Sequence, residues 1–142
     1  MSDAEDLDFE LITSARQLAP APALRQEAVT LEDWPTTSGK KPRLLEWELS
    51  AGEHADFVES GRVYKGGVFQ RYENRGEDIR FLAYTTRDQH GNRIWPTIEA
   101  AKATLEPLGR GTLLLLINAA NRVNNEKPAS AEGNSEETQS DS

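Results

Sequence analysis

The stretch PRLLEWELSAGE, residues 42–53, decides the fold because a strand pattern runs directly into a helix start. Its apolar side chains alternate with acidic ones, so that Leu45, Trp47 and Leu49 lie on one face. Glu46 and Glu48 lie on the other face. A period of two residues is typical of a strand, and we therefore expect one over residues 42–49.

A helix is expected immediately after this strand. Ser50 and Glu53 have the spacing of a capping box, in which the hydroxyl and the carboxylate each accept a hydrogen bond from a free amide at the helix start. The helix should run over residues 51–60. Gly61 should end it in a left-handed conformation.

The residues before this stretch predict a partner strand. Val29, Leu31 and Trp34 are spaced roughly as alternating residues over 28–34, and the segment PTTSG at 35–39 has the residue types of a turn. The simplest pairing is an antiparallel hairpin between residues 28–34 and 42–49.

Three further helices are expected in the second half. One runs from Glu77 to Arg87, with acidic residues at the positive end of its dipole and a base at the negative end. A strand remains the alternative for residues 79–86, because Phe, Tyr and Thr favour one. A polar turn should follow at 88–92, with Gly91 free to take a positive φ. Thr97 should cap a helix that runs to about residue 106, and the last helix should cover 112–123.

The predicted fold class is α+β, mainly α-helical, with an N-terminal β-hairpin followed by about four helices and a disordered acidic C-terminal tail. We divide the chain into a flexible, acidic, proline-containing segment at 1–26, one globular domain at 27–125 and the tail at 126–142. The tail has no aromatic or branched apolar residue, so burial cannot offset its ordering entropy. Most of the net charge of −8 lies at the two ends: residues 1–10 contain five acids and no base, and residues 126–142 contain five acids and one base.

Charge and hydropathy argue against several classes of partner. Acidic ends repel nucleic acid phosphates and anionic lipids, so we expect neither nucleic acid nor membrane as a partner. The longest apolar run, residues 113–117, is far shorter than the roughly 20 residues that cross a bilayer. The acidic N-terminus lacks the pattern of an export signal, and the absence of cysteine fits a reducing compartment. We expect a cytosolic protein.

The chain offers few residues that could perform catalysis. It has two histidines, His54 and His90, and no spacing that would join them to carboxylates in a metal site. We interpret both as surface residues. We therefore expect no enzyme, no catalytic residue, no metal and no cofactor.

The apolar run in the last predicted helix is the candidate protein-binding surface. Leu113, Leu116 and Ile117 share one helix face, but Leu114 and Leu115 lie off it, so the apolar arc is wider than a surface helix needs. Either the fold buries this arc, as in an ordinary core helix, or a partner covers part of it. Tryptophan is also favoured in binding hot spots. The residues predicted to contact a partner are Trp95, Leu113, Leu114, Leu116 and Ile117.

The order of these pieces resembles a known family. The segment KPRLLEWEL at 41–49, followed by Ser50, Ala51 and a Glu-containing helix, resembles the strand and helix start of the tail assembly chaperones of long-tailed bacteriophages. The run YTTRDQHGNRIW at 84–95 resembles a helix end and turn of that family, and NAANRVN at 118–124 resembles the end of its leucine-rich last helix. The resemblance covers about residues 28–125. This chain departs from the family at Trp95 and Pro96, where Phe and an acidic cap are usual, and in the longer, glycine-rich stretch 61–72.

The resemblance implies a non-catalytic protein of the host bacterial cytoplasm that binds and solubilises the tape measure protein and leaves before the virion is complete. Acidic ends would help to keep such a complex soluble. Many relatives self-associate, so the resemblance also implies oligomers of this chain, with the tail tube protein as a further candidate partner. Two other interpretations stay open. One is a small structural phage protein, such as a head-tail completion or tail accessory factor, and the other is a cytosolic protein-binding adaptor unrelated to phage.

Overall fold

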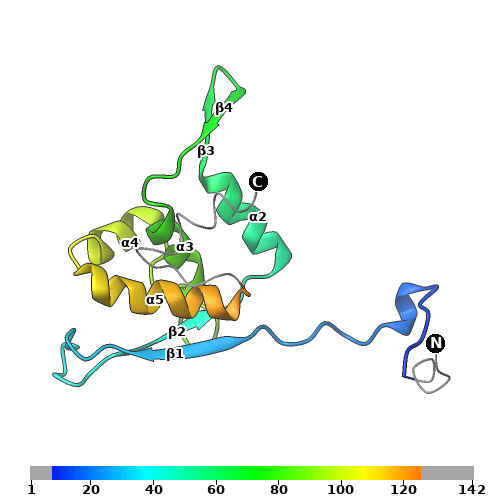
Figure 1. Cartoon of the computed structure of the whole chain (residues 1–142), viewed down its shortest axis with the longest axis horizontal. Coiled ribbons are helices and arrows are strands. Elements are labelled where there is room, and N and C mark those ends of the chain that lie inside the picture. The colour runs from blue at the N-terminus through cyan, green and yellow to red at the C-terminus, as the bar shows by residue number, and fades with distance from the viewer. Residues whose placement is uncertain (1–7, 126–142) are drawn as a thin grey trace, which may run out of the picture.

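The computed structural model describes residues 8–125, which form four α-helices, a three-stranded sheet and a separate two-stranded hairpin (Figure 1). This arrangement confirms the mixed α+β class. The tail predicted at 126–142 lies outside the described residues. The four helices are α2 (Ala51–Ser60), α3 (Glu77–Thr85), α4 (Ile98–Leu105) and α5 (Arg110–Val123).

The three-stranded sheet is antiparallel, with the strand order β1-β2-β5. Val29 of β1 lies opposite Leu44 of β2, which confirms the antiparallel pairing of the predicted hairpin. The first strand covers residues 26–30 rather than the predicted 28–34, so Leu31 and Trp34 lie outside it. Thr86 of β5 lies opposite Glu46 on the other edge of β2. The sequence did not predict β5, because two residues are too few to show a strand period. The strands are β1 (Gln26–Thr30), β2 (Arg43–Trp47) and β5 (Thr86–Arg87).

One face of this sheet packs against α5. It is the face that carries Glu46, because Glu27 lies opposite Glu46 and accepts a hydrogen bond from Arg122 of α5. Val29 lies opposite Leu44, so the alternation of side chains places Leu44 and Glu46 on the same face as Val29. Val29 and Glu46 are buried, whereas Leu45 and Trp47 lie on the opposite face and are half-buried. The acidic side of the predicted strand therefore points into the protein at Glu46.

The hydrophobic core is centred on α3. All residues from 79 to 85 are buried, and α3 packs against α2, α4 and α5. The helix excludes the strand alternative for 79–85, but it ends two residues before the predicted end at Arg87, because Thr86 pairs with β2 instead. The largest apolar side chains that are fully buried in residues 8–125 are Leu31, Leu82, Leu105, Leu116 and Ile117.

The predicted caps of α2 and α4 are confirmed. The Ser50 hydroxyl accepts a hydrogen bond from the Glu53 amide at 3.1 Å, and the Glu53 carboxylate accepts one from the Ser50 amide at 2.9 Å. At the start of α4, the Thr97 hydroxyl accepts a hydrogen bond from the Ala100 amide at 3.1 Å. The last helix begins at Arg110 rather than at the predicted residue 112, since its first turn accommodates a glycine.

Gly61 follows α2, but not in the left-handed conformation that we expected. Its φ is −95°, which other residues adopt readily. The reason for a glycine is space: a Cβ at this position would lie 2.5 Å from Cζ of Tyr72 and 2.8 Å from Nη2 of Arg80. Close packing at the base of the next hairpin therefore requires this residue.

That hairpin, formed by β3 and β4, was not predicted from the sequence, and Gly66 and Gly67 form its turn. Their φ angles are +59° and +82°, as the two-residue type I′ turn between adjacent strands requires. The available signal was a Gly-Gly pair between two short runs rich in aromatic and branched residues. The hairpin projects from the body of the protein (Figure 1). Its strands are β3 (Arg62–Lys65) and β4 (Val68–Tyr72).

Residues 8–25 form an arm that runs away from the body (Figure 1). Its far part contains a 3-10 helix, η1 (Ala15–Gln17), which Ser14 caps. The arm residues are exposed, apart from the half-buried Leu24. The sheet begins at Gln26, one residue before the predicted start of the globular domain.

Candidate protein-binding site

The five residues predicted to contact a partner do not form one surface. Leu116 and Ile117 have exposed fractions of 0% and 1%, and Trp95 is also buried. Leu113 and Leu114 are half-buried on α5. In this structure α5 packs its apolar arc largely into the core. This is the first of the two alternatives above, in which the fold itself buries the arc as in an ordinary core helix. Contact between these five residues and a partner stays a prediction.

An open groove lies where the connection between β1 and β2 meets the segment before α4. Its volume is about 290 Å³, near the small end of the range for ligand pockets. We call it the Trp34–Trp95 groove, after the two tryptophans among its lining residues. The lining residues are Trp34, Pro35, Thr36, Thr37, Pro42, Leu44, Ile94, Trp95 and Thr104.

The chemistry of this groove suits an apolar side chain. None of its lining residues carries a charge. Trp34 and Leu44 pack at the edge of the hydrophobic core while remaining partly exposed, and Ile94 is 41% exposed. Trp95 is thus the one predicted contact residue that lines this groove. Residues 35–39 were predicted only as a turn, but Pro35, Thr36 and Thr37 form one wall of the groove.

A more polar depression of about 360 Å³ borders the groove. It shares Leu44 and Ile94 with the groove. Charged and polar side chains complete it, which gives the groove a polar border of the kind that surrounds the apolar centre of many protein interfaces. The remaining lining residues are Arg43, Leu45, Arg87, Asp88, Gln89 and His90.

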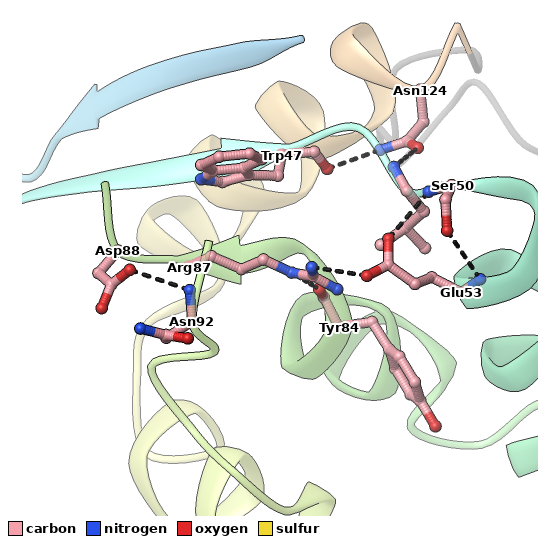
Figure 2. Close-up of polar contacts among 9 residues, drawn as sticks. Trp47, Ser50, Glu53, Tyr84, Arg87, Asp88, Asn92 and Asn124 are labelled. Atoms are coloured by element: carbon pink, nitrogen blue, oxygen red, sulfur yellow. Dashed lines mark hydrogen bonds and ion pairs between the residues drawn. The ribbon is translucent and has the colours of Figure 1, made fainter. Parts of the chain in front are cut away.

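A closed turn holds Ile94 and Trp95 in place. One Asp88 carboxylate oxygen accepts hydrogen bonds from the backbone amides of His90 at 2.8 Å and Asn92 at 2.9 Å (Figure 2 shows the bond to Asn92). These bonds, that of the Asn92 amide foremost, lower the pKa of Asp88. Gly91 has a φ of +87°, which confirms the predicted turn. The amide of Ile94 then bonds to the carbonyl of Thr86 at 3.1 Å, which ties the turn to β5.

The base of this turn is fixed by a buried arginine. Arg87 is 7% exposed, and its guanidinium donates to the Tyr84 carbonyl at 2.7 Å and to the Glu53 carboxylate at 2.8 Å (Figure 2). Burial raises the pKa of Glu53, but the hydrogen bonds from Ser50 and Arg87 outweigh burial and hold this pKa below its ordinary value. The pair therefore joins the end of α3 to the start of α2.

The end of α5 joins the same network. The Asn124 side chain accepts a hydrogen bond from the Leu49 amide at 2.9 Å and donates to the Trp47 carbonyl at 3.3 Å (Figure 2). Four segments carry the resemblance to the chaperone family, and they therefore meet in one place. They are the strand end, the helix start, the turn and the helix end. Their interactions here hold elements together and do not indicate a ligand.

Glu46 is the one fully buried carboxylate in the described part of the chain. Its two oxygens accept hydrogen bonds from the Thr85 and Thr86 hydroxyls, both at 2.7 Å. Burial raises its pKa to about 8 despite these bonds, with a further contribution from the charge of Glu27. Its exposed fraction is 0%, so in this conformation it is a structural group and not a site for a ligand.

The two histidines are both exposed, as expected. Within residues 8–125, no three His, Asp or Glu side chains gather as a metal site would require. In the same residues, no helix has the length and apolar character needed to span a bilayer. Comparisons with protein-family models, curated proteins and solved structures found no match to this chain.

Proposed function

We propose that this chain is a tail assembly chaperone of a long-tailed bacteriophage, which binds the tape measure protein in the host cytoplasm without catalysis. The Trp34–Trp95 groove is the observation that supports binding of protein. It is uncharged, open to solvent and bordered by polar residues. The sequence resemblance over residues 28–125 supplies the particular partner.

The groove suits the chemistry of this partner. A tape measure protein is a long helix with apolar side chains, and such helices bind by inserting those side chains into apolar grooves. A groove of about 290 Å³ would receive one or two side chains of the partner. Several copies would then be needed to cover a long helix, and their acidic ends would keep the complex soluble.

The test compares two substitutions that each replace an exposed apolar residue by glutamine, one inside the groove and one outside it. Ile94→Gln replaces a 41% exposed apolar residue of the groove, and Leu115→Gln replaces a 51% exposed apolar residue on α5 outside it. Each variant is co-expressed with a tape measure protein, and the captured partner is quantified. We expect Ile94→Gln to weaken binding about 10-fold, the loss of one contact of roughly 1.4 kcal/mol. We expect Leu115→Gln to bind like the parent chain.

Equal capture by both variants would exclude the groove as the binding site. Circular dichroism of each variant checks that the fold is retained.

A small structural phage protein, the first alternative function, would be found in purified particles, whereas a chaperone leaves before the virion is complete. An adaptor unrelated to phage would have no tape measure reading frame beside its gene.

A further inference from the structure

The arm exposes more apolar surface than a solvated segment needs. Phe9 is 78% exposed, Leu11 89% and Leu18 63%, and Ile12 is also exposed. These residues cluster on a short stretch that makes no strand pairing in the structure. Apolar residues concentrated in this way indicate a contact with another molecule.

The arm is nevertheless locally ordered. The side-chain oxygen of Gln17 accepts hydrogen bonds from the amides of Thr13 at 2.8 Å and Ser14 at 3.0 Å, and its nitrogen donates to Glu10 at 2.8 Å. At its other end, Arg25 fixes where the arm leaves the body, since its side chain donates to the Val123 carbonyl at 2.5 Å and its amide to Glu48 at 3.0 Å. The arm thus presents its apolar residues at a distance from its own body (Figure 1).

The β3–β4 hairpin exposes a second apolar surface, and its own residues include bases but no acid. Tyr64 is 46% exposed, Val68 67% and Phe69 53%, and the two rings contact each other edge to face. Residues 62–72 contain three bases and no acid, whereas residues 1–18 contain five acids and one base. Glu59 and Glu73 pair with two of the three bases, Arg62 and Arg71.

We propose that the arm of one copy of this chain, residues 8–18, binds the β3–β4 hairpin of a second copy. The apolar residues of the arm would cover those of the hairpin, and the acids Asp8 and Glu10 of the arm would face Lys65 of the hairpin. A two-stranded hairpin alone is marginally stable in water, so a covering segment also stabilises it. The contact joins two different surfaces, which allows more than two copies to associate. It needs only this chain and does not rest on the function proposed above.

The test uses purified full-length protein and two variants at exposed positions. The arm variant is Phe9→Ser with Leu11→Ser, and the hairpin variant is Val68→Thr with Phe69→Thr. Molar mass is measured by light scattering over a range of concentrations. We expect the parent chain to form assemblies of two or more copies and each variant to be monomeric. Mixing the variants should restore a two-copy species, because the intact arm of one can bind the intact hairpin of the other.

Leu115→Gln is the control, since it removes an equally exposed apolar residue elsewhere and should leave assembly unchanged. Lys65→Glu is a second hairpin variant, which leaves the apolar residues in place and should weaken assembly through charge. Circular dichroism establishes that each variant is folded. A parent chain that is monomeric at every concentration would overturn the proposal, as would a mixture of the two variants that stays monomeric. A failure to capture the tape measure protein would leave these results unaffected.

Discussion

Glu46 should make this protein less stable as the pH rises from about 5 to 8. In the unfolded chain its carboxyl group loses its proton near the ordinary pKa of 4.5, whereas in the folded protein burial raises the pKa to about 8. Between these values the folded state holds a proton that the unfolded state has released. The free energy of unfolding therefore falls with rising pH and levels off above the folded pKa.

The size of this effect follows from the two pKa values. At ~1.36 kcal/mol per pKa unit, the gap between 4.5 and about 8 corresponds to roughly 5 kcal/mol. Glu46→Gln removes the titration, and its amide can still bond with the Thr85 and Thr86 hydroxyls, which can both donate and accept. The variant should therefore match the parent chain near pH 5 and exceed its stability by several kcal/mol at pH 8.

Urea unfolding of the parent chain and Glu46→Gln at several pH values measures this difference directly, because titrating groups far from Glu46 contribute equally to both. Glu48→Gln is the matched control. The pKa of Glu48 is lowered, first by its hydrogen bond from the Arg25 amide, so its contribution to stability is lost only as the pH falls into the acidic range. A difference between Glu46→Gln and the parent chain that stays constant from pH 5 to 8 would show that Glu46 does not couple stability to pH in this range.

Three substitutions and one control, Gly52→Ala, test the packing and caps through the midpoint of urea unfolding. Gly61→Ala should destabilise the protein by about 1–3 kcal/mol, since a Cβ would meet the Tyr72 ring at 2.5 Å; Gly52→Ala, with nothing within 4 Å, should be neutral or stabilising. Ser50→Ala should cost about 1 kcal/mol through loss of the α2 cap, and an unchanged midpoint would show that the cap is dispensable. Leu82→Ala, at a fully buried position, should cost about 2–5 kcal/mol, and a loss below 1 kcal/mol would contradict its place in the core.

The sequence predicted those parts of the fold that local chemistry determines. The capping box at Ser50 and Glu53, the cap at Thr97 and the turn at Gly91 depend on residues a few positions apart, and the structure confirms all three. The β1–β2 hairpin was also predictable, because both strands alternate and a turn segment joins them.

The parts that were missed depend on contacts between distant residues. Alternation shows that Glu46 and Trp47 lie on opposite faces, but α5 and the Thr85 hydroxyl decide which face is buried. Gly61 is required by Tyr72 and not by its own φ. The candidate groove joins residues 34–44 to residues 94–104, and no pattern within either segment indicates that they meet.

We propose that this chain binds a long helical tape measure protein and keeps it in solution. Light scattering of the soluble material captured after co-expression with a tape measure protein gives the molar mass of the complex and tests this binding. We expect several copies of this chain on each partner, and an insoluble partner when it is expressed alone. Capture of no partner, together with the presence of this chain in finished particles, would contradict this proposal.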